Sequence, residues 1–145
     1  MSSWKRMLSI ADTIQQKADN AARVLAESRL RTAEHEAKLD ELVVYREEYT
    51  ERLRSLGQGG LGAVQVQGLN QFLGRLSQAI EQQQGILRRA RSEQEQNLQL
   101  WLASERRARS IDKAVARHRQ REEQIRDLHE QYENDACARL TACRK

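Results

Sequence analysis

Apolar residues recur in this chain at alternating steps of three and four over two long stretches. The first stretch runs from Trp4 to Leu56 without a break in register. Such a repeat keeps one stripe of side chains on one face of a helix, which is the pattern of a coiled coil. We therefore predict a helix over residues 3–56. Its seam positions are Trp4, Met7, Ala11, Ile14, Ala18, Ala21, Leu25, Ser28, Thr32, His35, Leu39, Leu42, Arg46, Tyr49, Leu53 and Leu56.

The second stretch carries the same spacing from Leu69 to Ala136, with more polar residues at its middle and far end. It predicts a helix over residues 69–140, followed by a short tail, 141–145. Its seam positions are Leu69, Leu73, Leu76, Ile80, Gln83, Leu87, Ala90, Gln94, Asn97, Trp101, Ser104, Ala108, Ile111, Val115, His118, Glu122, Ile125, His129, Tyr132 and Ala136.

A cluster of glycines separates the two stretches. Five of the seven glycines fall within residues 57–68, and the chain contains no proline. We expect this segment to be a loop, because glycine is the strongest breaker of helices apart from proline. Neither helix can bury its stripe alone, and two helices joined by one short loop fold back on each other. The predicted fold is all-α: a single domain formed by a two-helix antiparallel coiled-coil hairpin with a short glycine-rich loop.

The composition agrees with long helices rather than with a globular core. Aromatic residues make up 4% of the chain and charged residues 32%. A polar chain of this kind is otherwise a candidate for disorder, but the sustained periodicity argues against it. The N-terminus lacks the apolar core of a signal peptide, and no apolar run is long enough to span a membrane. Cys137 and Cys143 are expected on different helix faces, so an internal disulfide is not expected. We expect a cytoplasmic protein.

The two predicted helices differ in length, which has a consequence at the open end of the hairpin. If residue 56 faces residue 69, then residue 4 faces about residue 121. The remainder of the second helix would extend past the first as an overhang without a partner. This overhang carries apolar residues and is a candidate docking surface. Polar seam residues near Ser28, Thr32 and His35 are interpreted as fixing the register or loosening it locally, with a binding role as the alternative.

Charge is divided into blocks along the second helix. A basic block carries seven cations against Asp112, and an acidic block follows it from Glu122 to Asp135. The basic block is either a solvated helix surface or a docking surface for an acidic partner. Its arginines are Arg106, Arg107, Arg109, Arg117, Arg119 and Arg121.

No catalytic or metal-binding constellation is found in the sequence. His118 and Glu122 are four residues apart, but such a pair alone is too common to indicate a metal site. A two-helix rod has no concave pocket in which a nucleophile and a base meet, so we predict no enzyme, no cofactor, no metal and no small-molecule substrate. Nucleic-acid binding is not expected either, because no aromatic residues interleave the basic block and an acidic block follows it.

Four short segments of the two predicted helices form a recognisable combination. They are Ala21-Ala22-Arg23-Val24-Leu25, Tyr45-Arg46-Glu47-Glu48-Tyr49, Asn70-Gln71-Phe72-Leu73 and Ala79-Ile80-Glu81-Gln82-Gln83. These segments resemble the FliJ family, a small component of the bacterial flagellar type III export apparatus. The resemblance implies an antiparallel coiled coil similar to the central stalk of rotary ATPases, with no catalytic residues. The resemblance also implies that the open end of the rod binds the hexameric export ATPase, which makes the six arginines of the basic block candidates for this contact. It further implies binding to the large membrane subunit of the export gate and to substrate-specific export chaperones. Such a protein is peripherally associated with the inner membrane at the flagellar base.

The resemblance also points to a surface near the tip of the hairpin. Phe72 and Leu76 match the family and are candidates for contacting the export gate; packing at the tip is the alternative interpretation. Two other functions remain open on the sequence alone. One is the equivalent stalk protein of a virulence type III secretion system, and the other is a structural coiled-coil adaptor with no ATPase partner.

Overall fold

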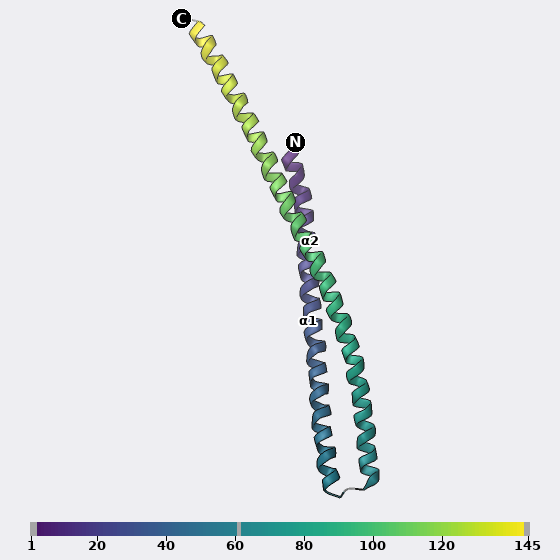
Figure 1. Cartoon of the computed structure of the whole chain (residues 1–145). Coiled ribbons are helices and arrows are strands. Elements are labelled where there is room, and N and C mark those ends of the chain that lie inside the picture. Colours follow the sequence, from purple (N-terminus) through teal and green to yellow (C-terminus); the bar gives the residue numbers. More distant parts are fainter. Residues whose placement is uncertain (1–2, 61, 144–145) are drawn as a thin grey trace. The chain divides into compact units, whose positions relative to one another are not determined.

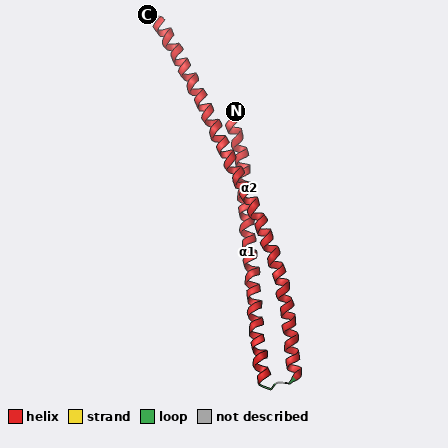
Figure 2. Cartoon of the chain, viewed as in Figure 1, coloured by secondary structure: helices red, strands yellow, loops and turns green. Residues whose placement is uncertain are grey.

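Two long helices make up the computed structural model, which describes residues 3–60 and 62–143. Helix α1 spans Ser3–Gln58 and helix α2 spans Ala63–Cys143 (Figures 1 and 2). They form an antiparallel helical hairpin, and the described residues contain no strand. The predicted fold class is therefore confirmed.

The break between the helices is shorter than the loop expected over residues 57–68. Only residues 59–62 lie between α1 and α2, and Gly68 lies inside α2. A glycine within a helix costs only about 1 kcal/mol, which the flanking helical residues offset, so the glycine cluster overstated the loop. α2 likewise continues through Cys143, three residues beyond the expected end at 140. The other two tail residues, 144–145, lie outside the described residues.

The turn itself depends on one glycine in a conformation that other residues avoid. Gly60 has a φ of 77°, in the left-handed region. The N–H of Gly59 donates to the carbonyl of Leu56 at 3.0 Å, which closes the end of α1. The carbonyl of Gly62 accepts from the N–H groups of Gln65 and Val66 at 3.1 and 3.3 Å, which opens α2. These bonds satisfy backbone groups that a helix end leaves unpaired.

Ala21–Leu100 forms one of two compact units, and it contains the turn. Figure 1 shows the two helices running side by side from this turn. The buried side chains of this unit come from the predicted seam of both helices. They are Leu25, Ser28, Thr32, Leu76, Ile80, Gln83 and Leu87.

The other unit joins the N-terminal segment up to Asn20 with the segment of α2 from Trp101 onward. Its buried residues are mostly small: Ala11, Ala18, Ala108 and Val115. Ala18 is completely buried, at 0% exposure. Small side chains at a seam allow the backbones of two helices to approach closely, so this unit is held by close contact rather than by large side chains.

The predicted seam is found almost unchanged in the structure. Every seam position from Trp4 to Leu53 in α1 is buried or half-buried, and so is every one from Leu69 to Glu122 in α2. Leu56, beside the turn, is exposed at 39%. All described residues from 123 onward are exposed. The predicted overhang is therefore present, and we use this name for residues 123–143.

Candidate protein-interaction surfaces

The start of the overhang is marked by contacts between the two helix segments of its unit. The backbone N–H of Ser3 donates to Glu122 Oε1 at 3.0 Å. The guanidinium of Arg119 lies over the ring of Trp4, 5.4 Å from its centroid. These contacts agree with the predicted register, in which residue 4 faces about residue 121. The carboxylate of Glu122 also fits its place, because it lies at the N-terminus of α1, where the helix dipole favours negative charge.

The overhang exposes large apolar side chains. Its exposed apolar residues are Ile125 at 66%, Leu128 at 65%, Tyr132 at 76% and Leu140 at 67%. Their spacing of three to eight residues continues the apolar pattern of the buried seam. An apolar stripe of this kind on a helix is typical of a surface that another helix or protein covers. Cys137 and Cys143 lie on the same segment and are free and exposed.

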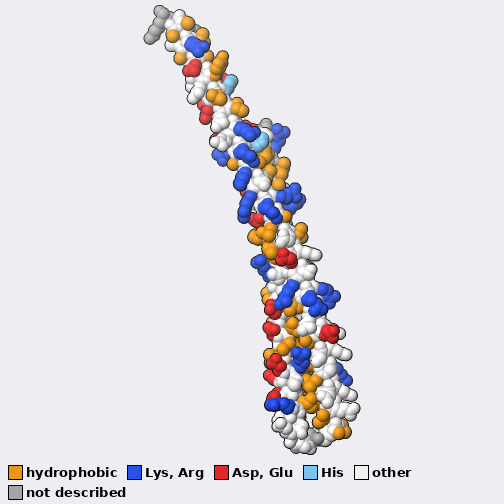
Figure 3. Space-filling model, in the orientation of Figure 1, with side chains coloured by type: hydrophobic (Ala, Val, Ile, Leu, Met, Phe, Trp, Pro, Cys, Tyr) orange, Lys and Arg blue, Asp and Glu red, His pale blue; other side chains and the backbone are white. Residues whose placement is uncertain are grey.

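The basic block precedes the overhang on α2, and we call residues 106–121 the basic band. Figure 3 shows Lys and Arg side chains gathered over this part of the molecule. Arg106, Arg109, Lys113, Arg117 and Arg121 follow one another at steps of three and four, so they lie on one helix face. The buried Ala108 and Val115 occupy the other side, and all the cations of the band are exposed.

Few of these cations are neutralised within the chain. Among the described residues of the band, only Arg119 forms an ion pair, with Glu123 at 3.1 Å. Arg106 and Arg117 make long hydrogen bonds to backbone carbonyls of their own helix, each 3.4 Å. The band therefore offers positive charge to a partner. The sequence correctly located the band, since all six candidate arginines lie in it. It could not tell that Arg119 is the one that forms an ion pair within the chain.

The two candidates for contact with the export gate, Phe72 and Leu76, differ in exposure. Phe72 is 40% exposed, and its ring lies against that of Tyr49 with centroids 4.7 Å apart and planes at 57°. Leu76 is buried between the helices, with 9% exposure. Phe72 therefore has surface to offer to a partner, whereas the position of Leu76 is that of a packing residue.

Sequence reasoning did not single out the tyrosines that extend the surface around Phe72. The ring of Tyr49 contacts that of Phe72 and also lies beneath the guanidinium of Arg52, 5.1 Å from the ring centroid. Tyr45, one turn earlier, is 47% exposed beside Val44, at 51%. A shallow depression at this place is lined by Glu41, Val44, Tyr45 and Glu48. The available signal in the sequence was the pair of tyrosines Tyr45 and Tyr49, which are four residues apart and therefore on one helix face.

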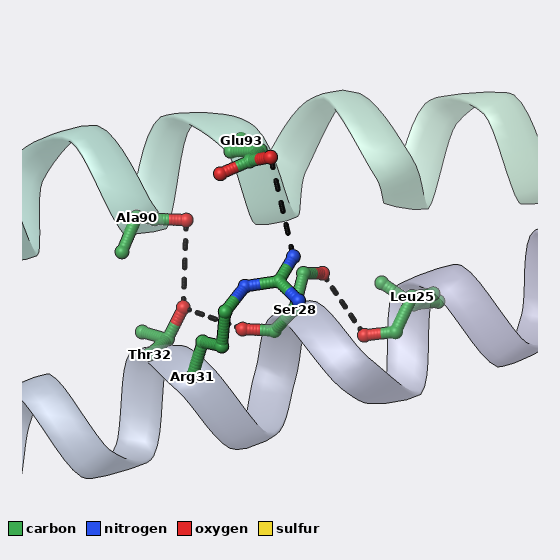
Figure 4. A network of polar contacts seen from close by, with 6 residues as sticks. All are labelled: Leu25, Ser28, Arg31, Thr32, Ala90 and Glu93. Carbon is green, nitrogen blue, oxygen red and sulfur yellow. Dashed lines mark hydrogen bonds and ion pairs between the residues drawn. The ribbon is translucent and has the colours of Figure 1, made fainter.

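A polar layer interrupts the seam in the unit that contains the turn (Figure 4). Thr32 donates from its hydroxyl to the carbonyl of Ser28 at 2.9 Å and lies 3.4 Å from the carbonyl of Ala90 on α2. Gln83 donates from Nε2 to the carbonyl of His35 at 3.0 Å. Each buried polar side chain thus has a partner, and the interpretation as a register-fixing layer fits this arrangement.

Two ion pairs between the helices flank the polar layer. Arg31 lies 4.0 Å from Glu93, and Arg91 lies 3.5 Å from Glu36. Each of them joins an arginine of one helix to a glutamate of the other. Because these groups are about half exposed, each pair contributes little to stability.

Within residues 3–60 and 62–143, no three His, Cys, Asp or Glu side chains are grouped so as to hold a metal ion. No described helix combines the length and apolar character needed to cross a bilayer.

Comparison with known proteins gives one match. The model of a family described as Flagellar FliJ protein matches residues 3–145. Neither the curated proteins nor the solved structures contain a significant match to the chain.

Proposed function

The chain belongs to the FliJ family and is a component of the flagellar type III export apparatus, and from this premise we propose that it acts as a non-enzymatic stalk of the export ATPase. In this role the open end of the hairpin binds the hexameric ATPase, and the other end contacts the large membrane subunit of the export gate. The protein also binds substrate-specific export chaperones. It works in the cytoplasm, peripherally associated with the inner membrane at the flagellar base.

The observation that carries the ATPase contact is the end of the buried seam at Glu122. Beyond it, α2 has apolar side chains without a cover in the described chain, among them Ile125 and Tyr132. Immediately before it lies the basic band, whose cations are mostly not neutralised by the chain's own acids. Apolar surface beside a band of one charge is suited to a protein partner, since charge speeds encounter and apolar burial holds the complex. We assign ATPase binding to the overhang and the basic band together.

The gate contact is supported by the aromatic surface near the turn. Phe72 and Tyr49 form a tilted aromatic pair, and Tyr45 adds an exposed ring on the same helix as Tyr49. Aromatic residues are enriched in the energetic centres of interfaces, because they bury large areas at low entropic cost. In this proposal Phe72 contacts the gate directly, and Leu76 holds the position of α2 one turn further on.

The decisive experiment measures the rate of ATP hydrolysis by the purified export ATPase of the same organism, with and without this protein. We expect stimulation by the full chain and loss of stimulation when residues 123–145 are deleted. This deletion keeps Glu122 and its bond to Ser3, so the hairpin remains paired. Circular dichroism checks that the shortened protein is still helical.

Other outcomes lead to different functions. Stimulation that survives the deletion removes the overhang from the ATPase contact. Absence of both stimulation and co-elution argues against a stalk of this ATPase, and binding to the ATPase of a virulence secretion system instead would assign the protein to that machine.

A further inference from the structure

The stripe on the overhang is the direct continuation of the buried seam. Ala108 and Val115 are buried, and Glu122 is half-buried. The same steps of three and four then lead to exposed residues, of which Tyr132 is 76% exposed. The seam thus keeps its spacing after α1 has ended. The exposed seam positions are Ile125, His129, Tyr132 and Ala136.

When two copies of the overhang run antiparallel, charged residues beside the stripe of one copy lie near opposite charges of the other copy. Arg126 and Glu133 each follow a seam residue by one position and lie seven residues apart, so they flank the stripe on the same side. When His129 of one copy faces Tyr132 of the other, Arg126 lies on the same edge of the seam as Glu133 of the partner subunit, offset along the helix by two residues or roughly 3 Å, which the long arginine side chain spans. Because the arrangement has a two-fold axis, each contact occurs twice.

The seam residues of the two copies also fit each other in size and charge. Ile125 then faces Ala136 of the partner subunit, a large side chain against a small one. A further step of three from Ala136 reaches Arg139, which comes level with Glu122 of the partner subunit. Asp135 and Arg121 also lie beside the seam and meet no opposite charge in this register, so the complementarity is carried by the Arg126–Glu133 and Glu122–Arg139 pairs.

A parallel pair is disfavoured by the same residues. In that arrangement each seam residue meets its own copy, so Glu122 meets Glu122 and Arg139 meets Arg139. Like charges opposite each other at an interface are repulsive and select against the arrangement. Charge therefore fixes the orientation of two overhangs as antiparallel.

We propose that the overhang is a homodimerisation segment in which residues 122–139 of two copies pair as an antiparallel coiled coil. The overlap ends where α1 begins, because Glu122 is the residue that receives the N–H of Ser3. The last turn of each α2 then lies next to the first turn of α1 in the other copy. The dimer covers Ile125 and Tyr132, so it and an ATPase complex through the overhang exclude each other.

The test is sedimentation equilibrium of the full chain over a range of protein concentrations, with a reductant present to exclude disulfides through Cys137 and Cys143. We expect a reversible monomer–dimer equilibrium that Tyr132→Glu abolishes. Glu133→Arg should weaken association about tenfold, because two ion pairs become two repulsions. Arg126→Glu should do the same, and the double variant Arg126→Glu/Glu133→Arg should restore the dimer.

Glu130→Arg is the matched control. It makes the same change of charge on the side of the helix away from Ile125 and Tyr132, and we expect association to be unchanged. A monomer at all concentrations, an equal effect of Glu130→Arg and Glu133→Arg, or a double variant as weak as the single ones would overturn the proposal. No ATPase takes part in this experiment, so its result is independent of the proposed function.

Discussion

Two sections of α2 have nearly the same sequence pattern and opposite surroundings. Between Leu69 and Leu100 the seam residues pack against α1, and Ile80 and Leu87 are only 3% and 4% exposed. Beyond Glu122 the seam positions have no partner helix among the described residues, and Ile125 is 66% exposed. Apolar periodicity alone therefore does not tell whether a stripe is core or surface. The end of the partner helix decides this, because it buries the stripe of the first section and leaves the stripe of the second exposed.

The largest expected difference between the sections is in the free energy of unfolding. Leu87→Ala should lower it by about 2–5 kcal/mol, because a buried leucine loses its contacts and leaves a cavity. Leu128→Ala makes the same change on the overhang and should alter it by less than about 0.5 kcal/mol. Urea unfolding followed by circular dichroism measures both. Equal losses at a protein concentration where the chain is monomeric would mean that the overhang is covered within the folded monomer.

The basic band should act through long-range charge. Replacing Arg106, Arg107 and Arg109 by glutamate should weaken ATPase binding about tenfold at low salt and much less at high salt, since salt screens exposed charges. The control reverses Arg75, Arg88 and Arg89, which are also exposed but lie in the section paired near the turn. Binding titrations at two salt concentrations compare the two variants. A loss that is the same at both concentrations would argue against steering by charge.

Phe72 and Leu76 lie one helical turn apart, near the turn of the hairpin. Substituting each of them compares a partly exposed candidate for binding with a buried packing residue. Phe72→Ala should cost about 1 kcal/mol of stability from the lost contact with Tyr49, and it should impair export. Leu76→Ala should destabilise more, because its side chain is buried. Thermal unfolding and an assay of flagellar protein secretion in cells test the pair. Normal secretion by a folded Phe72→Ala variant would restrict this residue to packing.

The smallest expected effect concerns the polar layer of the paired section. Gln83→Leu should raise the free energy of unfolding by about 0.5–1 kcal/mol, because a buried polar seam residue lowers coiled-coil stability. The carbonyl of His35, which accepts from Gln83, lies in the interior of α1. A carbonyl at such a position also accepts from the N–H four residues later, so the substitution does not leave it unpaired. Gln82→Leu is the exposed control and should be near neutral. A loss of stability in Gln83→Leu would show that the bond between the helices outweighs the cost of its burial.

The sequence by itself determined the seam, the reversal of the chain and the point at which pairing ends. These follow from spacing and helix length, which are local properties of a coiled coil. The prediction that residue 4 faces about residue 121 agrees with two contacts. Ser3 donates to Glu122, and Arg119 lies over the ring of Trp4.

Only the tertiary structure decided the length of the turn and the separate places of Phe72 and Leu76. Gly68 is helical, because the cost of a glycine is small beside the gain from continuing α2. Leu76 is buried and Phe72 half exposed, because burial at the edge of a seam depends on which side chain the other helix presents. Tyr49 presents a ring to Phe72, and no spacing rule within one helix contains that information.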